Sequence, residues 1–148
     1  MAKILVVHGP NLNLLGQRET DIYGTATLDS INQTLEKIAL ENKLQYEHFQ
    51  SNHEGQIIDK LQSLQGAVDF IIINPAAYTH TSVGIRDTLL AVNIPFIETH
   101  LSNPQKREHF RHTSYFSDIA YGIISGFGAK SYELAMQAAV EYCQHNCV

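Results

Sequence analysis

The sequence has few cysteines, no long hydrophobic run and no excess of positive charge, and each absence argues against a class of protein. Cys143 and Cys147 are the only cysteines among 148 residues, so we expect no disulfide framework and a reducing, cytoplasmic location. No apolar run approaches the roughly 20 residues that a membrane-spanning helix needs. The formal net charge of −5 argues against nucleic acid or an anionic membrane as the main partner, but it allows a local cationic pocket. The N-terminal residues lead directly into an apolar segment, so we expect no secretory signal.

Several motifs that mark common kinds of active site are also missing. Gly-x-Gly-x-x-Gly does not follow the first apolar segment and Gly-Lys-Ser/Thr does not occur, which argues against a nucleotide cradle. No Gly-x-Ser-x-Gly sequence marks a serine nucleophile. The eight histidines show no His-x-x-x-His or clustered Cys/His spacing, so we expect no metal site. The lysines lie mostly on expected helices, which argues against a Schiff-base lysine.

What the chain does contain is an alternation of apolar and amphipathic segments. Apolar runs without polar alternation are typical of strands buried on both faces, and the segments between them repeat apolar residues at helical spacing. Strands that alternate with helices predict a parallel sheet covered by helices on both faces. We therefore expect one α/β, flavodoxin-like catalytic domain over residues 1–148, with strand order 2-1-3-4-5. The strands are expected at residues 4–7, 44–49, 68–73, 94–97 and 120–125.

Capping residues mark the expected helix starts. Thr27 can cap the first long helix. Ser51 and Glu54 have the spacing of a capping box at the start of the second. Thr81 or Ser82 can cap the third. These capping residues indicate where each polar connection ends and the next helix begins.

A long connection follows the first strand. Residues 9–24 contain Gly9-Pro10, Gly16 and Gly24 as turn formers, and a loop of this length is usually functional or disordered. Because it carries Arg18 and Tyr23, we interpret it as a lid over a site. A surface loop with a solvated arginine is the alternative. Its large aliphatic residues favour burial over disorder: Leu12, Leu14, Leu15 and Ile22.

Polar clusters follow the first, third and fourth strands, which the predicted order makes neighbours. Ligands of such sheets bind beyond the carboxyl ends of the strands. The clusters suit a cofactor-free acid–base site for a polyhydroxylated carboxylic acid with a carbonyl group. If residues 106–112 are helical, Arg107 and Arg111 share one helix face. The proton-transfer candidates are Tyr23, His80, Glu98 and His100, the cations are Arg18, Arg107 and Arg111, and the neutral polar groups are Asn11, Asn74 and Ser102.

A family resemblance makes the predicted function of this acid–base site more specific. Gly-Pro-Asn-Leu-Asn-Leu-Leu-Gly at residues 9–16, followed by Arg18 and by Ile-Tyr-Gly at residues 22–24, resembles the opening of the type II 3-dehydroquinate dehydratases. The resemblance covers nearly the whole chain in register. Further segments that carry it are Gln-Ser-Asn-His-Glu-Gly at 50–55, Asn-Pro-Ala-Ala-Tyr-Thr-His-Thr-Ser at 74–82, Glu-Thr-His-Leu-Ser-Asn at 98–103, and residues 122–139.

The resemblance implies the dehydration of 3-dehydroquinate to 3-dehydroshikimate through an enolate, in the shikimate pathway or in quinate breakdown. It implies no cofactor, no metal and no Schiff base, and a homododecamer built as a tetramer of trimers. By resemblance, Tyr23 takes the C2 proton, Arg18 favours ionisation of Tyr23, His100 protonates the departing C1 hydroxyl, and Asn11 holds the enolate through a water. The implied substrate-binding residues are Asn74, His80, Asp87, Leu101, Ser102 and Arg111, with Glu98 and Arg107 as supports.

Other interpretations of the residues remain open beside the resemblance. Asp87 next to Arg86 could be a solvated pair, and Asn74 before Pro75 could be a turn residue. The alternative function is a non-catalytic, flavodoxin-like ligand-binding or receiver module. A receiver needs acidic residues after the first strand and a lysine after the last. His8-Gly9 and Ser125-Gly126 stand there instead, which disfavours a receiver.

Overall fold

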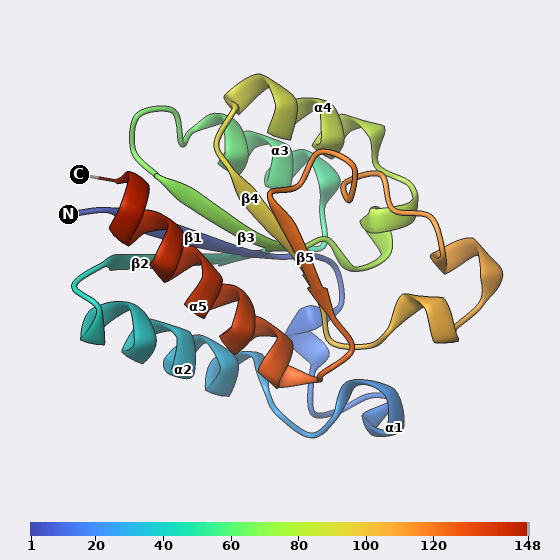
Figure 1. Cartoon of the computed structure of the whole chain (residues 1–148). Helices are drawn as coiled ribbons and strands as arrows, with labels where there is room; N and C mark the ends of the chain where they lie inside the picture. The colour runs from blue at the N-terminus through green and yellow to red at the C-terminus, as the bar shows by residue number, and fades with distance from the viewer. Residues whose placement is uncertain (148) are drawn as a thin grey trace.

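Five parallel strands form the sheet at the centre of the computed structural model, which describes residues 1–147 (Figure 1). Their order is β2-β1-β3-β4-β5, which confirms the predicted order. The register places His8 at the end of β1 opposite Asn74 at the end of β3. The strands are β1 (Lys3–His8), β2 (Gln45–Gln50), β3 (Phe70–Asn74), β4 (Phe96–His100) and β5 (Gly122–Ser125).

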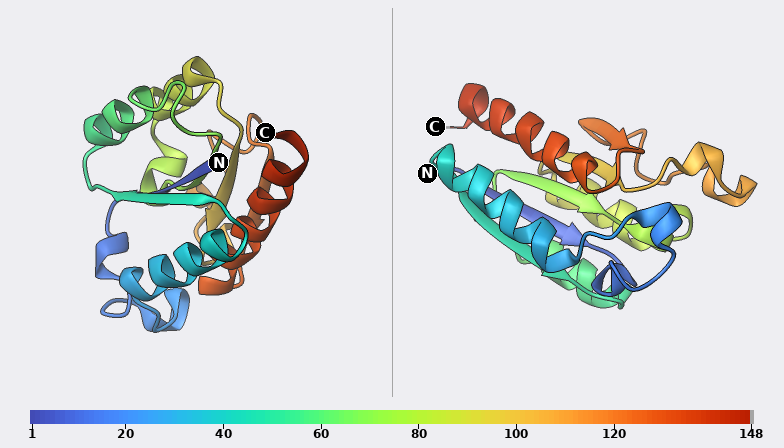
Figure 2. Two further views of the ribbon diagram at one scale, coloured as in Figure 1. Left: turned by 90° about the vertical axis from the view of Figure 1, so that its left-hand side faces the viewer. Right: turned by 90° about the horizontal axis from the view of Figure 1, so that it is seen from below.

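Helices cover both faces of the sheet (Figures 1 and 2). α2 (Leu28–Glu41) and α5 (Ala129–Asn146) pack on one face, and α3 (Glu54–Gln62) and α4 (Val83–Val92) pack on the other. The short helix α1 (Thr20–Tyr23) lies in the connection after β1. No helix in the described part of the chain is long and apolar enough to cross a membrane. Single 3-10 turns span Leu12–Leu14, Ala76–His80, Pro104–Lys106 and His109–Arg111.

The central strands lack polar alternation because both of their faces are buried. Ile4 and Val6 of β1 belong to the core beneath α2 and α5, whereas Leu5 and Val7 belong to the core beneath α3 and α4. All four side chains are fully buried. Burying one such side chain contributes about 1.5–3 kcal/mol, so the two cores hold the strand ends firmly in place.

Two of the three predicted helix caps are correct. The Thr27 hydroxyl accepts a hydrogen bond from the Ser30 amide at 3.1 Å, and the Ser82 hydroxyl accepts one from the Ile85 amide at 2.9 Å. The predicted Ser51–Glu54 capping box is wrong. The residue before α3 is His53. The amide of His53 donates a hydrogen bond to the Ser51 hydroxyl at 2.9 Å, within the turn that precedes the helix.

Only two of the four large aliphatic residues in the connection after β1 are buried in the core. Leu12 and Leu15 are buried in the core beneath α2 and α5, as predicted. Leu14 and Ile22 are 39% and 41% exposed, so the expectation of burial is wrong for these two. The reason is that Leu14 ends a 3-10 turn and Ile22 lies on α1, outside the helical layers. The loop is therefore anchored in the core by Leu12 and Leu15, and Tyr23 also packs against this core.

His8 is a buried polar side chain that the sequence pattern does not indicate. It is fully buried at the end of β1, with Nδ1 2.8 Å from the Tyr132 hydroxyl and Nε2 2.9 Å from Oδ1 of Asn32. Burial lowers the pKa of His8 to about 4; the hydrogen bond with Asn32 opposes this shift and nearby His48 adds to it. The imidazole is therefore neutral in the folded protein at neutral pH.

We expect the free energy of unfolding to fall as the pH is lowered from about 6.5 to 4. An unfolded histidine titrates near about 6.5, whereas folded His8 titrates at about 4. Between these values the unfolded state binds one more proton, so stability drops by about 1.4 kcal/mol per pH unit, about 3 kcal/mol in all. Denaturant unfolding curves across this window measure the slope. In His8→Gln, which cannot titrate at residue 8, the free energy of unfolding should fall less steeply with pH, by about 1.4 kcal/mol per pH unit. If the free energy of unfolding falls equally steeply in both proteins, His8 is not the cause.

Candidate active site

A cavity of about 130 Å³ lies at the carboxyl ends of β1, β3 and β4, where the polar clusters are predicted to meet. Ligands of open parallel sheets bind at this edge. Three guanidinium groups contribute to its wall, so the cavity is cationic although the chain is acidic. The predicted site residues on its wall are Asn11, Arg18, Tyr23, Asn74, His80, His100, Leu101, Ser102, Arg107 and Arg111.

Tyr23 lies beside two of these guanidinium groups. The Cζ atom of Arg18 is 4.8 Å from the centroid of the Tyr23 ring, and that of Arg107 is 5.2 Å from it. Arg18 comes from the same connection as Tyr23, whereas Arg107 follows β4. Nearby positive charge stabilises the ionised form of an acid. The arrangement is therefore suited to a tyrosine that works as a base.

Arg107 and Arg111 reach the cavity from two separate 3-10 turns, so the predicted shared helix face is wrong. The chain is extended at Arg107 and Glu108, which interrupts any helix between the turns. Arg107 donates a hydrogen bond to the Ser102 hydroxyl at 3.3 Å. Arg111 donates one to Glu108 at 3.0 Å. Both arginines are thus held by neighbours on the cavity rim.

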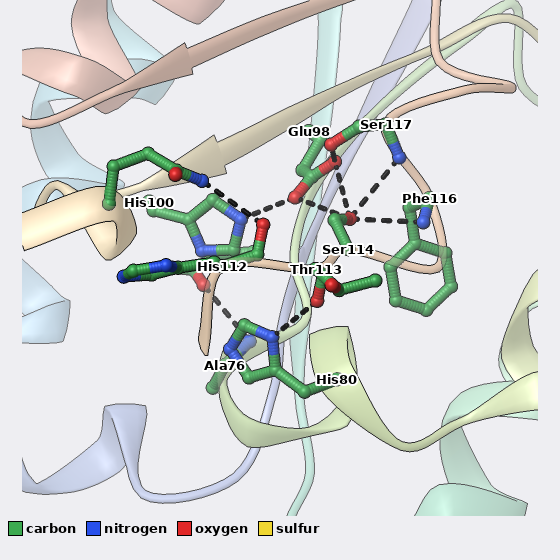
Figure 3. Close-up of polar contacts among 11 residues, drawn as sticks. Ala76, His80, Glu98, His100, His112, Thr113, Ser114, Phe116 and Ser117 are labelled. Carbon is green, nitrogen blue, oxygen red and sulfur yellow. Dashed lines mark hydrogen bonds and ion pairs between the residues drawn. The ribbon is translucent and has the colours of Figure 1, made fainter. Parts of the chain in front are cut away.

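His100 and Glu98 form a buried pair at the end of β4 (Figure 3). Nε2 of His100 is 2.5 Å from Oε2 of Glu98. The two residues are two positions apart in a strand and lie on the same side, as predicted. The Ser114 hydroxyl is 2.9 and 3.0 Å from the two oxygens of Glu98, and the Ser117 hydroxyl is 2.6 Å from one of them. The carboxylate is thus held from three directions.

Glu98 is ionised, and this fixes which nitrogen of His100 is available. Burial by itself would raise the pKa of Glu98, but the hydrogen bonds from His100, Ser117 and Ser114 outweigh burial and hold the pKa below its usual range. Because a carboxylate only accepts, Nε2 of His100 carries a hydrogen, and Nδ1 is left for the cavity. When His100 is doubly protonated it offers an N–H donor there, as a general acid must.

His80 can accept a hydrogen bond from a ligand, whereas His100 can donate one. Its Nδ1–H donates to the carbonyl oxygen of Thr113 at 2.8 Å (Figure 3). Burial lowers the pKa of His80, the Thr113 hydrogen bond partly opposes this, and the nearby charges of His100 and Arg111 add to it. His80 is therefore neutral at neutral pH, and the lone pair on Nε2 can accept a hydrogen bond from a ligand hydroxyl.

The loops that carry Asn11 and Asn74 are tied together by the backbone. Gly9 donates its amide hydrogen to the Asn74 carbonyl at 2.8 Å. A Cβ atom at Gly9 would lie 2.5 Å from the Pro75 carbonyl oxygen, so only glycine allows this approach. Asn11 has a φ of 68° and donates its amide hydrogen to Oδ1 of Asn52 at 3.0 Å. These contacts fix both asparagines at the cavity.

Asp87 is not on the cavity wall. It is exposed on α4, in a shallow surface depression with Arg86 and Asp118, and these two neighbours form an ion pair at 2.5 Å. Its implied role in substrate binding stays a prediction. Leu101, by contrast, is buried and supplies an apolar part of the wall.

Several supporting residues are not found by sequence reasoning. Ser114, Ser117 and Asn52 hold Glu98 and Asn11 from segments far away in the chain. Only Asn52 lies in a segment that the family resemblance singles out. Within residues 1–147 no group of three or more His, Cys, Asp or Glu side chains could hold a metal ion, and no lysine lines the cavity.

The chain is similar to known proteins along nearly its whole length. The family model Dehydroquinase class II matches residues 2–140. A 3-dehydroquinate dehydratase of Cellvibrio japonicus is 62% identical over 140 residues, which are 94% of this chain and 95% of that protein. The 3-dehydroquinate dehydratase 1 of Pseudomonas aeruginosa is 59% identical over 145 residues, 97% of this chain and 99% of that protein.

Solved structures show the same similarity. A type II dehydroquinase of Butyrivibrio crossotus superimposes with a TM-score of 0.90 at 45% identity, covering 93% of this chain and 96% of that one. A 3-dehydroquinate dehydratase-like protein of Bifidobacterium longum superimposes with a TM-score of 0.70 at 28% identity, covering 95% of this chain and 97% of that one.

Proposed function

Because the chain belongs to the class II dehydroquinase family, we propose that its cavity dehydrates 3-dehydroquinate to 3-dehydroshikimate by acid–base catalysis. The reaction is that of a hydro-lyase in the shikimate pathway or in quinate breakdown. One feature supports the assignment of roles most strongly: a tyrosine beside two guanidinium groups and a histidine held by a carboxylate face the same cavity.

In the first step, the Tyr23 phenolate removes a proton from C2 of the substrate. The C2–H electron pair moves toward C3, and the C3 carbonyl becomes an enolate. Arg18 stabilises the negative charge as it passes from the phenolate to the enolate. Asn11 holds the enolate oxygen through a water molecule. The positions of these residues on the cavity wall suit these roles.

In the second step, the enolate collapses and expels the C1 hydroxyl. The carbonyl re-forms at C3, a double bond forms between C1 and C2, and the C1–O bond breaks. The Nδ1–H of protonated His100 gives its proton to the departing oxygen, which leaves as water. Glu98 accepts the hydrogen bond from Nε2 and stabilises the imidazolium before the transfer.

Neutral and cationic groups on the cavity wall hold the substrate between the base, Tyr23, and the acid, His100. We assign Arg111 to the carboxylate, because a planar guanidinium matches the two carboxylate oxygens with paired donors. His80 accepts a hydrogen bond from a substrate hydroxyl through Nε2, and Asn74, Leu101 and Ser102 complete the wall. Arg107 lies beside the Tyr23 ring and supports it. No step in this scheme requires a cofactor or a metal ion.

We extend the proposal to assembly and location. Large apolar side chains remain exposed at and beyond the edge strand β5: Tyr121 is 61% exposed, Ile123 51% and Phe127 64%. Such exposure is typical of association surfaces. The number of subunits that we propose, a homododecamer built as a tetramer of trimers, is the one that the family resemblance implies. Cys143 and Cys147 are free thiols, which supports a cytoplasmic location.

The absorbance of the product tests the proposed function. Dehydration creates a conjugated enone, so purified protein, freed of metal ions with a chelator, should raise the ultraviolet absorbance of a 3-dehydroquinate solution. The rate should be proportional to protein concentration and absent after heat denaturation. If the native protein produces no enone, the proposed activity is wrong.

A further inference from the structure

Two serine hydroxyls outside the cavity hold the carboxylate that supports His100 (Figure 3). The Ser114 hydroxyl is 3.0 Å from Oε1 and 2.9 Å from Oε2 of Glu98, and the Ser117 hydroxyl is 2.6 Å from Oε1. Oε2 of Glu98 is in turn 2.5 Å from Nε2 of His100, which lines the cavity. Neither serine lines the cavity. An unbroken series of hydrogen bonds thus joins both serines to His100, and the catalytic scheme above gives the serines no role.

The hydroxyl of Ser114 can only donate to Glu98. Its oxygen accepts the backbone amide hydrogens of Phe116 at 3.0 Å and of Ser117 at 3.2 Å. A serine hydroxyl has two lone pairs and one hydrogen. Both lone pairs are therefore occupied, and the hydrogen is directed at the carboxyl group. Because the Phe116 side chain is fully buried in the core beneath α3 and α4, the fold fixes this geometry.

The position of the proton in the Glu98–His100 pair decides whether His100 can work as an acid. The pair can exist as a carboxylate with an imidazolium, or as a neutral carboxylic acid with a neutral imidazole. Glu98 and His100 are 1% and 8% exposed, and burial favours the neutral form because charges lose their hydration. Hydrogen bonds donated to the carboxylate favour the charged form. Only the charged form makes His100 acidic enough to protonate a leaving hydroxyl.

The other charges around His100 oppose an imidazolium. Three guanidinium groups share the cavity with it, and like charges disfavour one another. On the α4 side, Arg86 pairs with Asp118, so these two charges largely cancel. Among residues 1–147, Glu98 is the only buried carboxylate, so the imidazolium depends on it. The titratable and charged groups that share the cavity with His100 are Arg18, Tyr23, His80, Arg107 and Arg111.

We propose that Ser114 and Ser117 are positioning residues for the acid step: their hydrogen bonds keep Glu98 a carboxylate and so leave the shared proton on His100. The proposal rests on the proposed function, in which His100 gives that proton to the departing C1 hydroxyl. Removal of the C2 proton by Tyr23 needs neither serine. The two serines therefore act on the second step of the reaction and not on the first.

The partition of the enolate between return and dehydration measures this effect. In deuterium oxide, an enolate that returns to substrate takes up deuterium at C2, whereas one that loses the hydroxyl becomes product. We expect the double variant Ser114→Ala, Ser117→Ala to raise the ratio of C2 exchange to dehydration by at least about tenfold, because a hydrogen bond to a charged group changes an equilibrium by about that factor or more. The ratio does not depend on the folded fraction, since both reactions need folded enzyme. An unchanged ratio overturns the proposal.

Ser82→Ala is the matched control. Ser82 is fully buried, accepts the amide hydrogen of Ile85 at 2.9 Å and donates to the carboxylate of Glu54, as Ser114 does to Glu98. Ser82 does not line the cavity, so its loss should leave the ratio unchanged even where stability falls. If Ser82→Ala raises the ratio as much as the double variant does, the effect is a general one of losing a buried serine and the proposal is wrong.

A variant of Glu98 shows whether the serines act through its charge. Glu98→Gln keeps an acceptor for His100 but carries no charge. In that background, loss of both serine hydroxyls should change the ratio by less than about twofold. An equal rise in both backgrounds overturns the proposal. If the double serine variant does not fold, Ser114→Ala and Ser117→Ala test the same claim singly, each with an expected rise of about threefold or more.

Activity of the wild-type protein on 3-dehydroquinate is measured alongside these variants. If the wild type forms no enone, the proposed function is wrong. If the wild type is active and the serine variants show the same ratio of exchange to dehydration as the wild type, only the positioning role of the serines is wrong.

Discussion

Replacing Tyr23 with phenylalanine is expected to lower kcat by at least about 10³-fold, within the usual range for loss of a general base. The ring would remain beside the guanidinium groups of Arg18 and Arg107, 4.8 and 5.2 Å from its centroid in the wild type, so we expect substrate binding to be retained. Only the oxygen that takes the C2 proton is removed. The Kd for 3-dehydroquinate, measured by calorimetry on this inactive variant, should stay close to the wild-type KM.

The matched control for Tyr23 is Tyr121→Phe. Tyr121 is 61% exposed next to β5 and does not line the cavity, so loss of its hydroxyl should leave kcat unchanged. Exchange of the C2 proton with deuterium oxide provides a second measurement, because it requires the base alone. Tyr23→Phe should show no enzyme-dependent exchange. A variant that keeps a tenth of wild-type kcat would show that another group removes the proton.

Replacing His100 with alanine is expected to lower kcat by at least about 10²-fold, the low end for general acid catalysis. The variant also leaves Glu98 buried without its partner, although Ser114 and Ser117 still donate to the carboxylate. Unlike Tyr23→Phe, His100→Ala should still exchange the C2 proton, since the enolate can form and return even when the hydroxyl cannot leave. This contrast separates the base from the acid.

His109→Ala is the control for His100. His109 is exposed on a 3-10 turn and does not line the cavity, so its loss tests for a general effect of removing a histidine. Its kcat should match that of the wild type. If His100→Ala retains activity within threefold of the wild type, or if it loses C2 exchange together with dehydration, His100 is not the acid.

Local patterns were enough to predict the sheet and the edge where the site lies. Apolar runs set the strands, and the polar residues after β1, β3 and β4 meet at one cavity because parallel strands end together. Caps formed within a few residues, such as those of Thr27 and Ser82, were also predictable. These features depend on neighbours in sequence and on one topological rule.

Features that depend on distant residues were not predictable in this way. Ser114 and Ser117 donate hydrogen bonds to Glu98, and the Tyr132 hydroxyl is hydrogen-bonded to His8. These contacts join segments that only the folded chain brings together. The exposure of Ile22 follows from the position of α1 outside the layers, which apolarity alone does not reveal. The roles in catalysis came from the family resemblance, because the residue types alone fit several acid–base schemes.

Tyr23 is proposed to remove the C2 proton while Arg18 stabilises the negative charge on its oxygen. A unit positive charge about 4 Å from a phenolate oxygen would stabilise it by about 4 kcal/mol at an effective dielectric near 20 but by only about 1 kcal/mol in bulk water. Arg18 would therefore support the phenolate strongly only where water is excluded, so we expect closure of the loop over residues 9–24 to be part of the chemistry.

The rate of C2 proton exchange against pH in Arg18→Ala tests this claim most directly, because exchange needs the base and not the acid. A tyrosine without help ionises near about pH 10. We therefore predict that exchange in Arg18→Ala is slow at pH 7 and rises by up to about tenfold per pH unit toward pH 10, while the wild-type rate changes little. A flat profile for Arg18→Ala between pH 7 and 10 would contradict the claim, since it would show that Arg18 does not act through the ionisation of Tyr23.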